Sequence, residues 1–74
     1  MDVYIVSKLA NFWGVVNYGV ILSRSSTSSA AIRRAVQTAA RVAKDNGPAQ
    51  VLVESDEGDR RVVWDLTHDG SAAG

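Results

Sequence analysis

A single amphipathic helix pattern, from residue 27 to residue 45, constrains the fold of this chain most. The hydroxyl side chains of Thr27-Ser28-Ser29 can accept hydrogen bonds from the free amides of a first helical turn. Asn46-Gly47-Pro48 ends the pattern, because glycine readily adopts a left-handed conformation and proline cannot continue a helix. Between these ends, small apolar residues recur at helical spacing: Ile32, Ala35, Val36, Ala39, Val42 and Ala43. This stripe needs an apolar surface to cover.

The segments on either side of the helix have the composition of β-strands. Residues 3–7 and 12–17 are rich in β-branched and aromatic side chains, and we expect them to form a hairpin. Residues 50–54 and 61–66 predict a second hairpin around a polar loop that contains a glycine. Residues 20–22 would form a short additional strand before the helix. In the last strand, strict alternation places Val62, Trp64 and Leu66 on one face.

These elements predict a two-layer α+β fold, in which one helix packs on a four-stranded antiparallel sheet. The expected order is strand–strand–helix–strand–strand, with the short extra strand before the helix. Residues 1–70 would form one domain and residues 71–74 a disordered tail. We expect large side chains of the sheet to fill the space opposite the alanine stripe, namely Trp13, Trp64, Ile5 and Val53.

Length and composition restrict how such a domain is stabilised. A chain of 74 residues buries only a small core. It has no cysteine and one histidine, which excludes disulfides and a Cys/His zinc site. Small domains often gain stability by self-association, so a homodimer is expected, with a monomer as the alternative. No apolar run approaches the roughly 20 residues of a membrane span, and we expect a cytoplasmic protein.

No group of residues has the arrangement of a catalytic or metal site. His68, Asp69 and Ser71 have the residue types of a hydrolytic triad, but they cluster in the expected tail, where nothing fixes their geometry. The acidic loop at residues 56–59 is far shorter than a calcium-binding loop of about 12 residues. We therefore expect a non-enzymatic protein without catalytic residues, cofactor, metal or evident small-molecule substrate.

The order of elements resembles a family of short bacterial proteins classed as a domain of unknown function. The resemblance covers about residues 3 to 68 and includes Trp13-Gly14-Val15 in the second strand, the alanine-rich helix and the valine-rich strand Val51-Leu52-Val53. The last hairpin departs from the family, because Glu57-Gly58-Asp59 replaces the usual Asp-Gly followed by a basic residue. The resemblance implies the strand–strand–helix–strand–strand fold and a bacterial origin, and it implies no activity.

Basic residues gather on and just before the helix. Residues 24–44 hold five of the eight basic residues and no acidic one, whereas residues 45–69 hold seven of the eight acidic ones. The simplest interpretation is a solvated helix face whose cations pair with acids of the sheet loops. The alternatives are an acidic partner protein or, less favoured, the phosphates of a nucleic acid. The candidate partner-binding residues are Arg24, Arg33, Arg34, Gln37, Arg41, Lys44 and Tyr18.

Together these patterns favour a small binding protein of unknown target. It would act through a homodimer, formed at a sheet edge or at the open sheet face, and through the basic face of the helix. One alternative is an inhibitor or regulator of a larger bacterial machine, such as a phage-encoded protein that acts on a CRISPR interference complex. Another alternative is a weak nucleic-acid-binding module.

Overall fold

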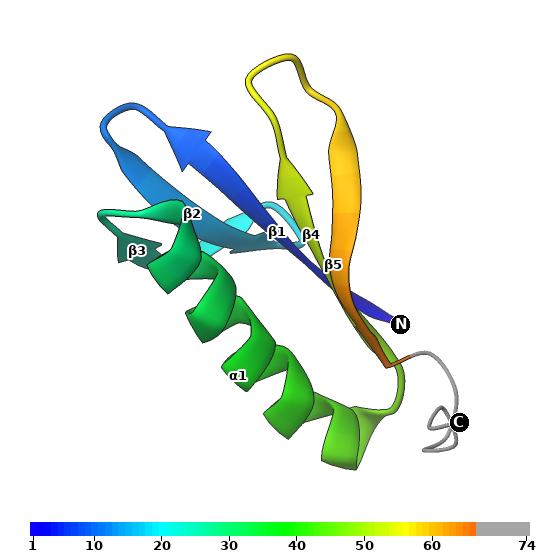
Figure 1. Cartoon of the computed structure of the whole chain (residues 1–74). Coiled ribbons are helices and arrows are strands. Elements are labelled where there is room, and N and C mark those ends of the chain that lie inside the picture. The colour runs from blue at the N-terminus through cyan, green and yellow to red at the C-terminus, as the bar shows by residue number, and fades with distance from the viewer. Residues whose placement is uncertain (67–74) are drawn as a thin grey trace.

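One helix lies across one sheet in a computed structural model that describes residues 1–66. The α+β class expected from the sequence is therefore confirmed, with one helix packed on one sheet (Figure 1). The proposed tail at residues 71–74 and the group formed by His68, Asp69 and Ser71 lie outside the described residues. The elements are β1 (Asp2–Leu9), β2 (Phe12–Asn17), β3 (Val20–Ser25), α1 (Ser28–Asn46), β4 (Ala49–Glu54) and β5 (Arg60–Leu66).

The sheet differs from the expected one in strand number and direction. It has five strands in the order β3-β2-β1-β4-β5, and β1 and β4 are parallel, while the other neighbours are antiparallel. The expectation of an extra strand before the helix is confirmed by β3, but the prediction of a four-stranded sheet with antiparallel strands throughout was wrong. The reason is that β3 is a full strand that carries the chain to the edge of the sheet. The helix then crosses back to β1, and β4 enters in the same direction as β1, as such helical crossovers require.

The predicted ends of the helix are confirmed by their hydrogen bonds. The Thr27 hydroxyl accepts a hydrogen bond from the Ala30 amide at 3.2 Å, which satisfies one free donor of the first turn. At the other end, Gly47 has a φ of 93° and its amide donates to the Ala43 carbonyl at 3.2 Å. A residue with a Cβ would be strained at that φ, so the glycine ends the helix where the sequence indicates.

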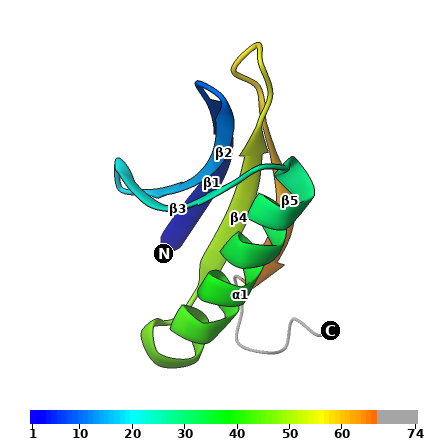
Figure 2. The same ribbon diagram turned by 90° about the vertical axis from the view of Figure 1, so that its left-hand side faces the viewer.

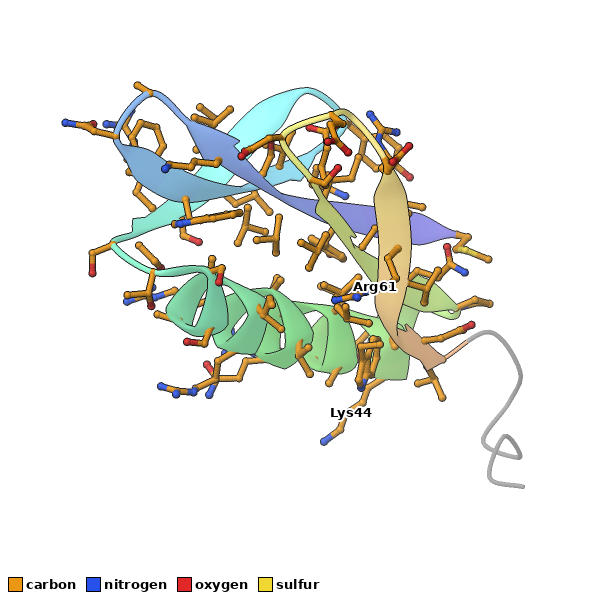
Figure 3. The ribbon with its side chains drawn as sticks, turned by 45° about the horizontal axis from the view of Figure 1, so that its top comes forward. Lys44 and Arg61 are labelled. Carbon is orange, nitrogen blue, oxygen red and sulfur yellow. The ribbon has the colours of Figure 1, made fainter. Side chains whose placement is uncertain are left out.

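The core lies between the helix and one face of the sheet, as Figure 3 shows. Ala31, Ala35 and Ala39 are fully buried, so the small-residue stripe does face the sheet. Because these side chains are small, the helix lies close to the strands, and Trp13, Val53 and Trp64 pack around the contact as expected. Ile5 was also expected there, but it alternates with buried residues of β1 and lies on the opposite face. The buried sheet residues are Tyr4, Val6, Val15, Ala49 and Val51.

An irregularity in β5 changes which of its side chains face the helix. The register between β4 and β5 shifts between Val51 and Leu52, which leaves Val63 as an extra residue on β5. Trp64 pairs with Val51 on the helix side, while Val62 pairs with Leu52 on the other side. The expectation that Val62, Trp64 and Leu66 share a face was therefore wrong for Val62, since a bulge reverses the alternation.

Candidate functional site

The outer face of α1 carries an exposed set of cations and one amide. We call this set the basic helix surface; its members are Arg33, Arg34, Gln37, Arg41 and Lys44, and all are exposed. Steps of three and four residues place Arg33, Gln37, Arg41 and Lys44 along one side of the helix. Lys44 points away from the sheet in Figure 3. The structure thus brings together five of the seven predicted partner-binding residues.

The basic helix surface has no acidic partner among the described residues. The ion pair found in residues 1–66 joins Arg60 Nε and Glu54 Oε2 at 3.2 Å, within the β4–β5 hairpin. The expected pairing between helix cations and loop acids was therefore wrong. The two hairpins project beyond the first turn of the helix (Figures 1 and 2), which holds the acidic loop between β4 and β5 away from the helix face.

Arg61 lies on the helix side of the edge strand β5, where it lines a hollow with Glu57 and Asp59 of the hairpin loop. It pairs in register with Val53, which packs against the core, so its side chain leaves β5 on the helix side (Figure 3). Sequence reasoning missed this residue, because strict alternation from Trp64 places it on the other face. The direction of Arg61 depends on the bulge at Val63, and no sequence pattern in β5 indicates that bulge.

Two of the predicted partner-binding residues lie elsewhere. Arg24 is on β3, opposite Gly14, and its guanidinium carbon lies 4.8 Å from the centroid of the Phe12 ring on the face that the helix does not cover. Tyr18 is in the turn between β2 and β3, where it is 74% exposed, as expected, and its hydroxyl donates to the Met1 carbonyl at 3.3 Å. Neither residue belongs to the basic helix surface.

A second distinctive surface is the face of the sheet opposite the helix. One apolar side chain from each strand lies there in register, and together they form a row across the whole sheet. The helix packs on the opposite face of the sheet, and no described element covers this row. We call it the cross-strand row, and it consists of Ile21, Val16, Ile5, Leu52 and Val62.

Polar groups border the cross-strand row on the same face. The Ser7 hydroxyl donates to Glu54 Oε1 at 2.9 Å, and Arg60 Nε donates to the other carboxylate oxygen at 3.2 Å. The hydrogen bond from Ser7, and after it the one from Arg60, lowers the pKa of the Glu54 carboxyl below its usual value. Both donors stabilise the charged form, so this corner of the face is polar.

The described residues show no arrangement of a metal site or a membrane span. Residues 1–66 contain no cluster of three or more His, Cys, Asp or Glu side chains that could hold an ion. Within the same residues, α1 is not apolar enough over a sufficient length to cross a bilayer. A hollow of about 330 Å³ lies at the loop end of the β4–β5 hairpin, with a lining of both charge signs: Val53, Ser55, Glu57, Asp59, Arg60 and Arg61.

Fold and surfaces define a small α+β domain with a basic helix surface on one side and an apolar sheet face on the other. Comparison with known protein families, with curated proteins and with solved structures gave no match. The resemblance to a bacterial family of unknown function therefore stays a prediction.

Proposed function

We propose that this protein is a non-enzymatic interaction domain, which binds an acidic protein surface through the basic helix surface and self-associates as a homodimer. The observation that carries the proposal is the exposure of Arg33, Arg34, Arg41 and Lys44 without an acidic partner in residues 1–66. A cluster of cations with no internal partner repels itself, and an acidic partner relieves this repulsion.

The geometry of the basic helix surface sets the kind of partner. Arg33 and Lys44 are separated by three turns of helix, about 16 Å at a rise of about 1.5 Å per residue. Carboxylates spaced one helical turn apart would match Arg33, Arg41 and Lys44 along this length. Guanidinium groups bind carboxylates in a bidentate manner, so the arginines would give the contact its orientation.

A defined acidic peptide provides the test. A helical peptide with glutamates at every fourth position should bind the wild-type protein, measured by fluorescence anisotropy at low salt. The Arg33→Glu/Arg41→Glu variant should bind about tenfold more weakly, because two exposed pairs of up to about 1 kcal/mol each are lost and 1.4 kcal/mol corresponds to tenfold.

Arg24→Glu provides the matched control, because it reverses a positive charge on the other face of the sheet. Affinity within twofold of wild type is expected for it. If Arg24→Glu weakens binding as much as a single helix reversal, net charge rather than the helix surface governs binding, and the proposal fails.

The same assay decides between an acidic protein and a nucleic acid. Binding of a short DNA duplex by the basic helix surface would engage only a few phosphates, so its affinity should fall with salt with a slope set by that small number. DNA binding that is tighter than peptide binding and is lost in Arg33→Glu/Arg41→Glu would replace the present proposal with the nucleic-acid one. In the alternative of an inhibitor or regulator, the acidic surface belongs to a larger bacterial machine. The basic helix surface would make the same contact with it.

A further inference from the structure

The cross-strand row is an apolar feature on the sheet face that the helix leaves open. Ile5, on the central strand, pairs with Val16 on one side and Leu52 on the other. The outer members reach the surface, with Ile21 43% and Val62 45% exposed. Above the row, the Leu9, Phe12 and Ile21 side chains gather over Gly14 and extend the apolar surface. Apolar patches of this kind mark interaction sites, since their exposure to water is unfavourable.

The edges of the sheet are less suited to association than its open face. β3 carries an extra residue where its register with β2 shifts between Val15 and Val16, and β5 carries one at Val63. Bulges bend an edge strand and interrupt the regular spacing that an added strand would need. Both edges have this feature, so the open face is better suited than either edge to form a homodimer.

The size of the open face fits a second copy of the chain. Five strands about 4.8 Å apart, each with about six residues of 3.3 Å, cover on the order of 500 Å² in projection. The accessible area of the side chains exceeds this projection. A specific interface takes roughly 600–1,000 Å² from each partner, so a partner sheet of equal size would use the whole face.

The charges beside the row are arranged so that a second copy complements the first. On the open face of β5, Arg60 precedes Val62 and Asp65 follows it. On β4, Glu54 pairs in register with Arg60 and Gln50 pairs with Asp65, on either side of Leu52. A two-fold axis along the row reverses the strand direction in the second copy. Arg60 then faces the partner's Asp65, and Glu54 faces the partner's Gln50.

We propose that two copies of this chain pack sheet face to sheet face, with a two-fold axis along the cross-strand row. The inference rests on the homodimer in the proposed function and specifies its interface. Aligned sheets pack with their strands about 30° apart, which the twist of each sheet permits. Both helices then lie on the outside, so the dimer presents two basic helix surfaces in opposite directions and can bridge two acidic partners.

Charge substitution in the row tests the interface. Sedimentation velocity should give twice the 7.9 kDa chain mass for the wild type at micromolar concentration. In Ile21→Lys/Val62→Lys, each new cation faces its own counterpart across the axis, so the dissociation constant should rise at least a hundredfold. Val20→Lys is the matched control, because Val20 is 57% exposed but lies on the other face of β3. It should dimerise as the wild type does, and circular dichroism should show a folded chain in each variant.

Charge exchange tests the direction of the axis. Arg60→Glu and Asp65→Lys should each weaken dimerisation about tenfold, because each variant places like charges together twice in the dimer. The double variant should restore the wild-type affinity. Additive weakening in the double variant, or a row variant that still dimerises, overturns the inference. A monomeric wild type at 100 µM overturns it together with the homodimer, while binding of the acidic peptide would still support the helix-surface proposal.

Discussion

The hydroxyl of Ser7 and the carboxylate of Glu54, 47 residues apart in sequence, lie 2.9 Å apart across the parallel pair of β1 and β4. Arg60 donates to the second oxygen of the same carboxylate at 3.2 Å. The group is partly exposed, and both bonds favour its charged form. This contact joins the hairpin before the helix to the hairpin after it.

Glu54 should make the stability of the fold depend on pH. Its pKa is lower in the folded chain, so the folded state is favoured above the unfolded pKa of about 4.3. This stabilisation is lost as the pH falls through the folded pKa. The free energy of unfolding, measured in urea, should differ less between pH 7 and pH 3 for Glu54→Gln than for the wild type. Glu57→Gln, in the exposed loop, should retain the wild-type difference. Equal behaviour of the two variants would contradict the role of Glu54.

Ala39 should not tolerate a large side chain, because it is fully buried where α1 contacts the sheet. Ala39→Phe should lower the free energy of unfolding by about 1–3 kcal/mol through overpacking. Gln37→Phe, on the exposed side of the same helix, should change it by less than about 0.5 kcal/mol. Urea denaturation gives both values. A similar loss in the two variants would show that helix propensity and not packing is responsible.

Gly14 should be required by the side chains that gather over it. A Cβ at this position would lie 2.8 Å from Leu9 Cδ1 and 3.5 Å from Phe12 Cε2. Gly14→Val should therefore cost about 1–3 kcal/mol of unfolding free energy. Leu9→Ala makes room, so the double variant should be more stable than the sum of the single changes predicts. Strict additivity in this double-mutant cycle would exclude the contact as the cause.

Arg61 should contribute to binding by the basic helix surface, although it lies on β5. Arg61→Glu should weaken binding of the acidic helical peptide about two- to fivefold, in line with a single exposed charge pair. Arg24→Glu is the matched control, since it reverses a positive charge on the face of the sheet that the helix does not cover. Fluorescence anisotropy at one ionic strength measures both variants. Equal weakening of peptide binding by the two variants would mean that the peptide does not distinguish the helix side of the sheet from its open face.

Local sequence patterns predicted the helix and most of the strands correctly. Thr27, the alanine stripe and Gly47 act within one or two turns of chain, so their roles follow from neighbouring residues alone. The exposure of Arg33 and Arg41 follows from the same periodicity, because the opposite side of the helix is apolar. The basic helix surface could be predicted in part for this reason.

The sheet order could not be predicted in this way. Whether β4 adds beside β1 or elsewhere depends on where α1 brings the chain back, and that position is set by packing between distant segments. The separation of the helix cations from the loop acids depends on the same arrangement, so the charge run alone suggested ion pairs that residues 1–66 do not form.

The sequence by itself determined the helix, its buried stripe, its charged side and the strand-forming segments, because these depend on residues close together in the chain. Only the tertiary structure decided that β1 and β4 are parallel, and that bulges in β3 and β5 alter the alternation. One extra residue in β5 places Val62 in line with Leu52 and Arg61 beside the helix. Side-chain direction in a strand depends on its pairing with a neighbour, and that pairing is a property of the whole sheet.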